Sequence, residues 1–257
     1  MDYRSERIIA EEFQKFLMTG TLYQGSKPVM WSPVEKTALA EAEIEYQDHK
    51  SHTIWVKFPV KTTGASADDI DKEIEARRTS LEEQGKGYSE LDEARDREDL
   101  NLMDANVVIW TTTPWTIPSN KAVAFSNNIS YGLYEVSDTP EECWARKNDR
   151  YLLADNLAES VLKSARLEPS MYKRRRSVDA SELSQLVCEH PFWGADGADG
   201  FWDYEVPMID GDHVTDDAGT GFVHTAPSHG QEDYDAFVAR GWMDRMTHNV
   251  GEESEFL

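Results

Sequence analysis

The sequence lacks several features that would place it in common protein classes. It has only two cysteines, Cys143 and Cys188, which lie far apart and match no metal-binding spacing. No window approaches the roughly 18–20 apolar residues of a membrane-spanning helix, so no membrane partner is expected. The first residues are charged and lack the apolar core of a secretion signal. We therefore expect a soluble protein in a reduced, cytoplasmic setting.

Positive charge is also scarce. The 26 Lys and Arg residues stand against 49 Asp and Glu residues, giving a net charge of −23. This balance argues against broad, sequence-independent binding to nucleic acid, which depends on neutralising phosphates. The exception is the basic run 173–176, which could contact a phosphate backbone or form a solvated loop. The signatures of phosphate-binding loops, dinucleotide-binding folds and serine-hydrolase elbows are all absent.

What is present is the composition of a globular protein. The 257 residues are 39% hydrophobic and 11% aromatic, enough for a substantial core. We expect a single domain over residues 1–257, with flanking segments at 1–20 and 243–257. Residues 65–100 are dense in Asp and Glu, which predicts an acidic insertion of one or two solvated helices, or a partly mobile excursion. A functional acidic arm is the alternative.

Hydrophobic spacing predicts a fold that is mainly β with peripheral helices. Helices are expected over residues 6–19, 155–165 and 231–241. Strands are expected over residues 42–47, 52–60, 106–110, 121–125, 131–136, 151–153, 186–192, 205–209 and 222–223. Many short strands with interspersed helices favour a sheet closed into a β-barrel, with α/β decorations at its rim.

Three consecutive threonines follow the buried strand predicted at residues 106–110. Thr111, Thr112 and Thr113 precede Pro114, which lacks a backbone donor and cannot continue a central strand. The hydroxyl groups are therefore displayed at a strand end, where they could bind a polar ligand or a water molecule. The alternative is that threonine is simply a good strand residue.

The second unusual stretch runs from Asp210 to Tyr234. Gly219 and Gly221 predict a tight turn that a ligand can approach closely, and His224 ends the short strand that follows. Asp233 falls in the first turn of the last predicted helix, where the macrodipole favours negative charge. The alternatives are a histidine hydrogen-bonded inside the wall and an acid that merely stabilises its helix.

A metal site was considered for the histidine and carboxylate residues of this stretch. The candidate ligands are His213, His224, His229, Asp216 and Asp233. The spacing of His224 and His229 spans a proline and is not the helical His-x3-His arrangement. We therefore expect no metal and no cofactor.

Together the two stretches resemble the editing domain of isoleucyl-tRNA synthetase, which is inserted in the class I catalytic fold. The resemblance rests on residues 110–120 and 219–234. Thr113 stands where valyl and leucyl relatives usually carry arginine, and Trp115 follows the proline, which favours the isoleucyl branch. Further similarity lies in residues 27–33, 37–43 and 190–192. Ser228 departs from the expected glycine and puts only the local turn geometry in doubt.

The resemblance implies an editing activity. The ATP-site signatures of the family are missing, so the chain resembles an excised domain that does not activate amino acids. The implied reaction is hydrolysis of the ester of misacylated Val-tRNA(Ile), and valyl-adenylate stays open as a second candidate substrate. A pocket that senses only one methylene discriminates weakly between isoleucine and valine, and this synthetase is itself the standard example of that limit. The implied partners are the tRNA(Ile) 3′ end and the parent catalytic domain, with the chain as a monomer.

The resemblance also assigns site residues. As catalytic residues it implies Thr111, Thr112, Thr113 and Asp233, and as substrate-binding residues His224, Asn120, Trp110, Trp115, Gly219, Gly221 and Thr225. Asp233 would hold the α-ammonium group, and His224 would exclude the longer isoleucine side chain. The threonines would orient water and the terminal ribose. Two other functions stay open: a non-catalytic module that binds an RNA 3′ end, and a metal-dependent esterase.

Overall fold

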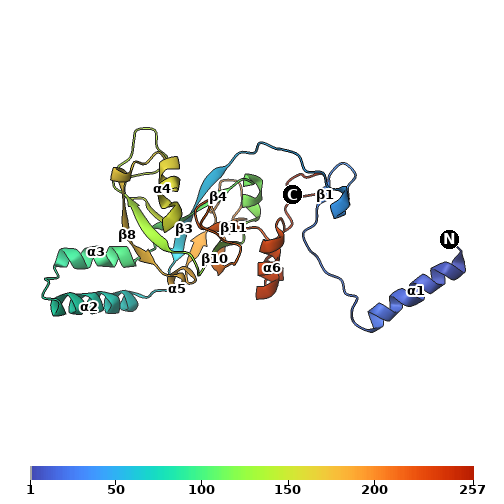
Figure 1. Cartoon of the computed structure of the whole chain (residues 1–257), viewed down its shortest axis with the longest axis horizontal. Coiled ribbons are helices and arrows are strands. Elements are labelled where there is room, and N and C mark those ends of the chain that lie inside the picture. Colours follow the sequence, from blue (N-terminus) through green and yellow to red (C-terminus); the bar gives the residue numbers. More distant parts are fainter. Residues whose placement is uncertain (1) are drawn as a thin grey trace.

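The computed structural model describes residues 2–257. A central sheet carries helices on its periphery, and the N-terminal helix α1 lies apart from it (Figure 1). The helices are α1 (Tyr3–Met18), α2 (Ala67–Glu83), α3 (Glu90–Leu100), α4 (Asp155–Ser164), α5 (Ala180–Leu183) and α6 (Gln231–Arg240). The strands are β1 (Trp31–Ser32), β2 (Thr37–Ala38), β3 (Ile54–Thr62), β4 (Ala105–Thr111), β5 (Ala122–Phe125), β6 (Tyr131–Val136), β7 (Arg150–Ala154), β8 (Tyr172–Val178), β9 (Val187–Glu189), β10 (Glu205–Asp210) and β11 (Val223–Thr225).

The prediction of a mainly β, closed barrel is wrong. Nine strands form one mixed sheet in the order β11-β5-β10-β9-β3-β4-β7-β6-β8, and over residues 2–257 no ladder joins its two ends. The pairs β4–β7 and β5–β10 are parallel, while the other pairs are antiparallel. Helix makes up about 32% of the chain and strand about 22%. At the open β8 edge, arginine side chains of this strand bind the end of helix α3.

The core lies where β4, β5, β6 and β7 meet helix α4. Every residue of β5 and β7 is buried, as expected for central strands with long apolar runs. On α4, Leu157, Val161 and Leu162 share one face at helical spacing and pack into this core. The ends of β4 and β5 are therefore held rigidly from behind.

Of the two elements predicted near the N-terminus, the helix forms and the strand does not. Helix α1 forms, but none of its described residues is buried, and Phe13 and Phe16 are exposed. The strand expected at residues 42–47 does not form. A 3₁₀ turn at Glu41–Glu43 and irregular chain occupy that region, because no neighbouring strand offers it backbone partners. Among the described residues, no helix is long and apolar enough to cross a membrane.

The acidic segment 65–100 forms a helical hairpin of α2 and α3 that projects from the β8 edge (Figure 1). Ser66 and Ser89 cap the two helices through capping boxes. Arg77 pairs with Asp96 at 3.2 Å, and Arg97 pairs with Asp71 at 2.6 Å, so ion pairs join the two helices. The hairpin is thus an ordered element with its own internal contacts.

The basic run 173–176 belongs to strand β8 and not to a solvated loop. Arg174 binds both carboxylate oxygens of Asp155 at 2.8 Å. Arg175 contacts Asp99 at 2.7 Å and Glu135 at 2.5 Å. Because these guanidinium groups already have carboxylate partners, they are poorly placed to bind a phosphate backbone.

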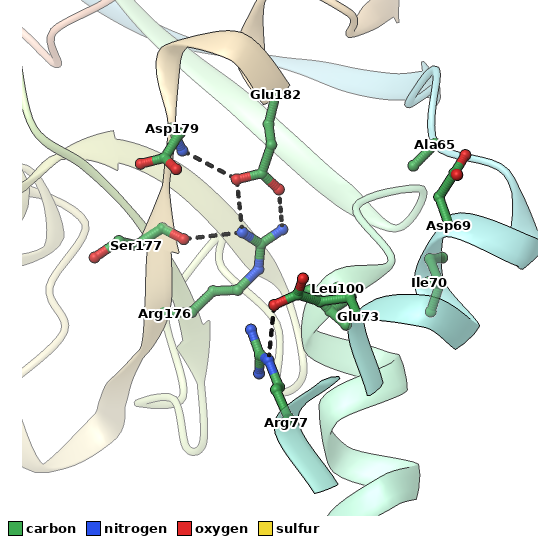
Figure 2. A pocket seen from close by; sticks show the side chains of 10 residues that line it. All are labelled: Ala65, Asp69, Ile70, Glu73, Arg77, Leu100, Arg176, Ser177, Asp179 and Glu182. Carbon is green, nitrogen blue, oxygen red and sulfur yellow. Dashed lines mark hydrogen bonds and ion pairs between the residues drawn. The ribbon is translucent and has the colours of Figure 1, made fainter. Parts of the chain in front are cut away.

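The last arginine of the run lies at a cavity of about 360 Å³ between the hairpin and β8. Figure 2 shows the Arg176 guanidinium bound by Glu182 and by the backbone carbonyl of Ser177. Glu182 also accepts a hydrogen bond from the backbone N–H of Asp179, as part of a capping box at the start of α5. Arg176 therefore serves to fasten α5 to the sheet edge.

Candidate functional site

The threonine run and the glycine–histidine segment line one cavity, although they lie far apart in the sequence. Strand β4 ends at Thr111, and β11 pairs antiparallel with β5 so that His224 lies opposite Val123. The cavity between the two segments has a volume of about 240 Å³. It is lined by Trp110, Thr111, Thr112, His213, Thr215, Ala218, Gly219, Gly221, Phe222, Val223 and His224. The topology of the sheet thus brings the two motifs together.

Backbone hydrogen bonds fix the threonine turn. The Thr111 hydroxyl accepts from the backbone N–H of Thr113 at 3.0 Å. The Thr116 hydroxyl donates to the backbone carbonyl of Thr113 at 2.8 Å. Thr111 is buried, whereas Thr112 is exposed at the cavity mouth. The turn therefore offers one fixed and one freely accessible hydroxyl to a ligand.

His224 forms a neutral wall of the cavity. Its Nε2 lies 2.9 Å from the Thr116 hydroxyl, and its Nδ1 lies 3.4 Å from Nδ2 of Asn120. Asn120 Nδ2 also donates to the Ala122 carbonyl at 2.8 Å. Nδ1 therefore accepts, and Nε2 carries the proton that is donated to Thr116. Burial, with smaller effects of His190 and His229, lowers the pKa of His224 to about 4.

The two glycines of the turn have different tasks. Both have left-handed backbone conformations, with φ of +80° at Gly219 and +81° at Gly221. A Cβ atom at Gly221 would lie 2.3 Å from the Cβ of Ala154, so this position requires glycine for packing. A Cβ at Gly219 would lie 3.6 Å from the ring of Trp110, where it would narrow the cavity. Gly219 is therefore the glycine that keeps the cavity open.

Asp233 lies beside the cavity and does not line it. It occupies the first turn of α6, as predicted, and its Oδ2 accepts from the backbone N–H of Ala226 at 2.8 Å. Burial raises the pKa of Asp233 above its ordinary value, opposed by the Ala226 hydrogen bond and by the charge of His213. A carboxylate with incomplete compensation for its burial gains stability when a cation binds.

The remaining predicted residues lie away from the cavity surface. Asn120 and Thr225 are fully buried, and Asn120 reaches the cavity only through His224. Thr113 lines a neighbouring cavity with residues 49–52. Trp115 is half exposed and lines both that cavity and a larger one, of about 630 Å³, formed with the terminal segments. The structure therefore brings together six of the eleven predicted residues around one space: Trp110, Thr111, Thr112, Gly219, Gly221 and His224.

The sequence suggested His213 only as a candidate metal ligand. His213 lines the cavity, and its Nε2 is buried without a hydrogen-bond partner in the structure. Its position before the glycine turn was the only available signal, because the sequence does not reveal which way the ring points. In the described part of the chain, no group of three or more His, Cys, Asp or Glu side chains is arranged to hold a metal ion.

Comparison with known proteins places this chain in a family. Residues 1–204 match the family model described as tRNA synthetases class I (I, L, M and V). The chain belongs to the class I tRNA synthetases. It is 49% identical to isoleucine–tRNA ligase of Ruegeria pomeroyi, over the whole of this chain and 23% of that protein. It is 48% identical to the Rhodopseudomonas palustris enzyme, over 98% of this chain and 22% of that protein.

This class I synthetase chain thus spans less than a quarter of the length of the curated relatives it matches. The resemblance to the isoleucyl enzymes predicted from the two motifs is confirmed. Its fold is similar to that of the editing domain of the Plasmodium falciparum cytosolic leucyl-tRNA synthetase with insertions 1 and 3 deleted. That comparison has a TM-score of 0.51 and 12% identity, and it covers 79% of this chain and 72% of the other. The comparison at this identity concerns the fold alone.

Proposed function

We propose that this synthetase segment, residues 1–257 as one domain with the hairpin as an insertion, hydrolyses the ester of misacylated Val-tRNA(Ile). The observation that carries the proposal is the shared cavity of the threonine run and the glycine–histidine segment. A hydrolytic site for an aminoacyl ester needs hydroxyl groups near the carbonyl, a wall that limits side-chain size and an anion for the ammonium group. Those three requirements correspond to Thr111 with Thr112, His224 and Asp233.

The threonine turn is proposed to position the attacking water. The buried Thr111 hydroxyl and the exposed Thr112 hydroxyl lie at the end of a strand packed from behind by the core. Rigid placement of water near the ester carbonyl lowers the entropic part of the barrier. Hydrogen bonds to the developing oxyanion would stabilise the transition state. A hydroxyl of the terminal ribose would assist as a proton relay within the substrate.

His224 is proposed to limit the size of the bound side chain. Its ring is held on both nitrogens, by Thr116 and Asn120, so it cannot swing out of the way of a larger ligand. Because burial keeps the ring neutral at physiological pH, it adds bulk without repelling the substrate ammonium. Asn120 acts through His224 and is therefore a positioning residue.

The decisive experiment is a deacylation assay with the purified chain and mischarged Val-tRNA(Ile). We expect release of free valine by the wild type and sparing of Ile-tRNA(Ile). His224→Ala should admit the isoleucyl ester and raise its hydrolysis at least tenfold, since the pocket wall is removed. Circular dichroism and melting curves check that the variant folds.

Three results would contradict the proposal. Binding of the tRNA end without turnover would identify a non-catalytic RNA-binding module. Loss of activity after chelation, restored by added zinc, would identify a metal-dependent esterase. A His224→Ala variant that still spares the isoleucyl ester would remove His224 as the size gate. Valyl-adenylate assayed in parallel ranks the two candidate substrates.

A further inference from the structure

A second cavity adjoins the threonine turn on the side of residues 49–52, and we call it the outer cavity. It has a volume of about 410 Å³ and is lined by His49, Lys50, Ser51, His52, Thr112, Thr113, Pro114 and Trp115. Thr112 lines both the outer cavity and the smaller cavity whose wall includes His224. A ligand that contacts Thr112 from the proposed ester site can therefore extend into the outer cavity.

The pairing of β3 with β4 explains why residues 49–52 lie beside the threonine turn. The two strands are antiparallel, and Ile54 at the start of β3 is paired with Thr111 at the end of β4. The chain that leads into β3 therefore runs alongside the chain that leaves β4. This register places residues 49–52 against Thr112 and Thr113, although the α2–α3 hairpin separates the two segments in the sequence.

The side chains of residues 49–52 are exposed and carry hydrogen-bond donors without partners in the protein. Lys50 has an ammonium group with three N–H donors, Ser51 has a hydroxyl group, and each of the two imidazole rings has at least one N–H donor. Within residues 2–257, no hydrogen bond or ion pair engages these four side chains. In contrast, Lys57 and Lys61 of the strand that follows each have a carboxylate partner.

Lys50 is the only cationic side chain among the described residues that line the cavities around the threonine turn. The ester cavity has no lysine or arginine in its lining, and neither does the larger cavity that shares Trp115 with the outer cavity. Asp48 precedes Lys50 in the sequence but does not line the outer cavity. In a chain with a net charge of −23, a local cation is needed to offset the overall repulsion of a polyanion.

We propose that Lys50 and the neighbouring donors of residues 49–52 bind the phosphate group on the 5′ side of the terminal nucleotide of an aminoacyl-RNA. This proposal rests on the proposed function. In such an ester the acyl group and the phosphate are attached to opposite sides of the terminal ribose. With the ester in the smaller cavity and the ribose at Thr112, the phosphate lies in the outer cavity, where an ammonium group is a suitable partner for it.

This arrangement distinguishes the two candidate substrates. In an aminoacyl-adenylate the phosphate is joined directly to the acyl group, so it would lie in the ester cavity and not beside Lys50. The outer cavity thus selects esters of a polynucleotide over the adenylate. Lys50 is a specificity-determining residue that acts on the RNA strand and not on the amino acid.

The test compares two valyl esters that differ only in the charge of one linkage. One is the valyl ester of the dinucleotide cytidylyl-adenosine, and the other has an uncharged methylphosphonate in place of its phosphodiester. Lys50→Ala should lower kcat/KM for the phosphodiester compound roughly threefold to tenfold, because a partly exposed charged contact is lost. Hydrolysis of the methylphosphonate compound and of valyl-adenylate should change less than about twofold, since neither places a charge at Lys50.

Two variants control for nonspecific effects of charge. Lys50→Arg keeps the cation and should retain most of the preference for the phosphodiester compound. Lys163→Ala removes another exposed lysine, on helix α4, and should leave all three rates unchanged. Equal losses of Lys50→Ala on the charged and uncharged compounds, or no loss on the charged one, would overturn the assignment of Lys50.

A binding measurement separates this proposal from the proposed function. In the probe, valine is joined through an amide to a dinucleotide with a 3′-amino group, so that it cannot be hydrolysed, and calorimetry gives its affinity. Weaker binding by Lys50→Ala, with unchanged binding of the methylphosphonate form, supports the phosphate contact even if the wild type hydrolyses no ester. Equal affinities of wild type and variant for the charged probe, or no binding by either protein, would overturn it.

Discussion

The edge of the sheet at β8, next to the α2–α3 hairpin, is called the hairpin edge below. The hairpin edge and the threonine cavity differ in how completely their polar groups are paired. At the hairpin edge, Arg174, Arg175 and Arg176 each have a carboxylate partner within 3 Å. At the cavity, His213 Nε2 is buried without a hydrogen-bond partner, and the nearby Asp233 carries a raised pKa. The first arrangement stabilises the free protein, whereas in the second the burial of a polar atom and a carboxyl group is not fully compensated.

The two regions also differ in how many charged groups they contain. A net charge of −23 and a run of basic residues attract attention in the sequence, yet the arginines of this run pair with carboxylates of β6, α3, α4 and α5. The cavity is modest in charge and rich in hydroxyl and imidazole groups. The proposed site is therefore distinguished by these hydroxyl and imidazole groups and not by conspicuous charge.

The largest expected effect that separates the regions is a loss of stability in mild acid. Burial lowers the pKa of both His190 and His224 to about 4, below the ordinary value near 6.5. The unfolded chain therefore binds more protons, so their contribution to stability is complete above pH 6.5 and is lost as pH falls toward 4. Between pH 7 and 5 the two histidines should lower the free energy of unfolding by roughly 4 kcal/mol in total.

Urea denaturation at pH 7 and pH 5 measures this difference, and His190→Gln should reduce it by about half. The hairpin edge should respond less. Burial acts to raise the pKa of Asp155, but hydrogen bonds from Arg174 and Tyr134 hold this pKa below its ordinary value. The ion pair of Asp155 and Arg174 therefore stays charged at pH 5. Hydrogen exchange that accelerates first in the hairpin, and not in β5 and β11, would contradict this order.

The next largest effect is expected at the hairpin edge itself. Arg175→Ala would leave Asp99 and Glu135 partly buried without their shared cation. Removing one partner of a buried ion pair is strongly destabilising, and the remaining exposure of these groups reduces the cost to about 2–3 kcal/mol. Chemical denaturation should show this loss, while deacylation per folded molecule should change less than twofold.

A replacement of both partners provides the matched control. Arg175→Met combined with Asp99→Asn removes the cation and one of the two anions, so it should be less destabilising than Arg175→Ala alone. If Arg175→Ala abolishes deacylation at a temperature where the protein is folded, the hairpin edge is coupled to the cavity. The division into a stabilising region and a binding region would then be wrong.

The sequence predicted which residues lie together at the cavity better than it predicted how the strands pair. Strong local signals, such as the strand–threonine–proline order and the glycine turn before His224, predicted residues that do share a cavity. The closed barrel was wrong because strand order depends on which edges pair, and local patterns do not encode that. Strand β8 was missed because its arginines are polar in sequence and are held in the sheet through carboxylate partners that lie far away in the sequence, such as Asp99.

The place of His213 in the cavity lining was not predictable for the same reason, since the direction of its ring depends on a turn over Gly211 that the residue types alone do not reveal. Asp233 in the first turn of α6 was predictable, because helix starts are local. The position of the Asp233 carboxylate relative to the cavity was not predictable, because it depends on how the loop from Ala226 to Gly230 places helix α6.

The smallest change in stability, and the sharpest contrast with Arg175, is expected for Asp233→Asn. Because burial raises the pKa of Asp233, its ionised form disfavours the fold at neutral pH, and this cost grows as pH rises above the ordinary carboxyl pKa near 3.8. The amide keeps an oxygen for the Ala226 N–H and removes the buried charge, against a small loss at the start of α6. Its free energy of unfolding should be unchanged or higher by up to about 1 kcal/mol, while deacylation of Val-tRNA(Ile) falls at least a hundredfold. Parallel melting and deacylation measurements decide the matter: a variant that loses stability and activity together would show that Asp233 supports the fold and does not await a cationic substrate.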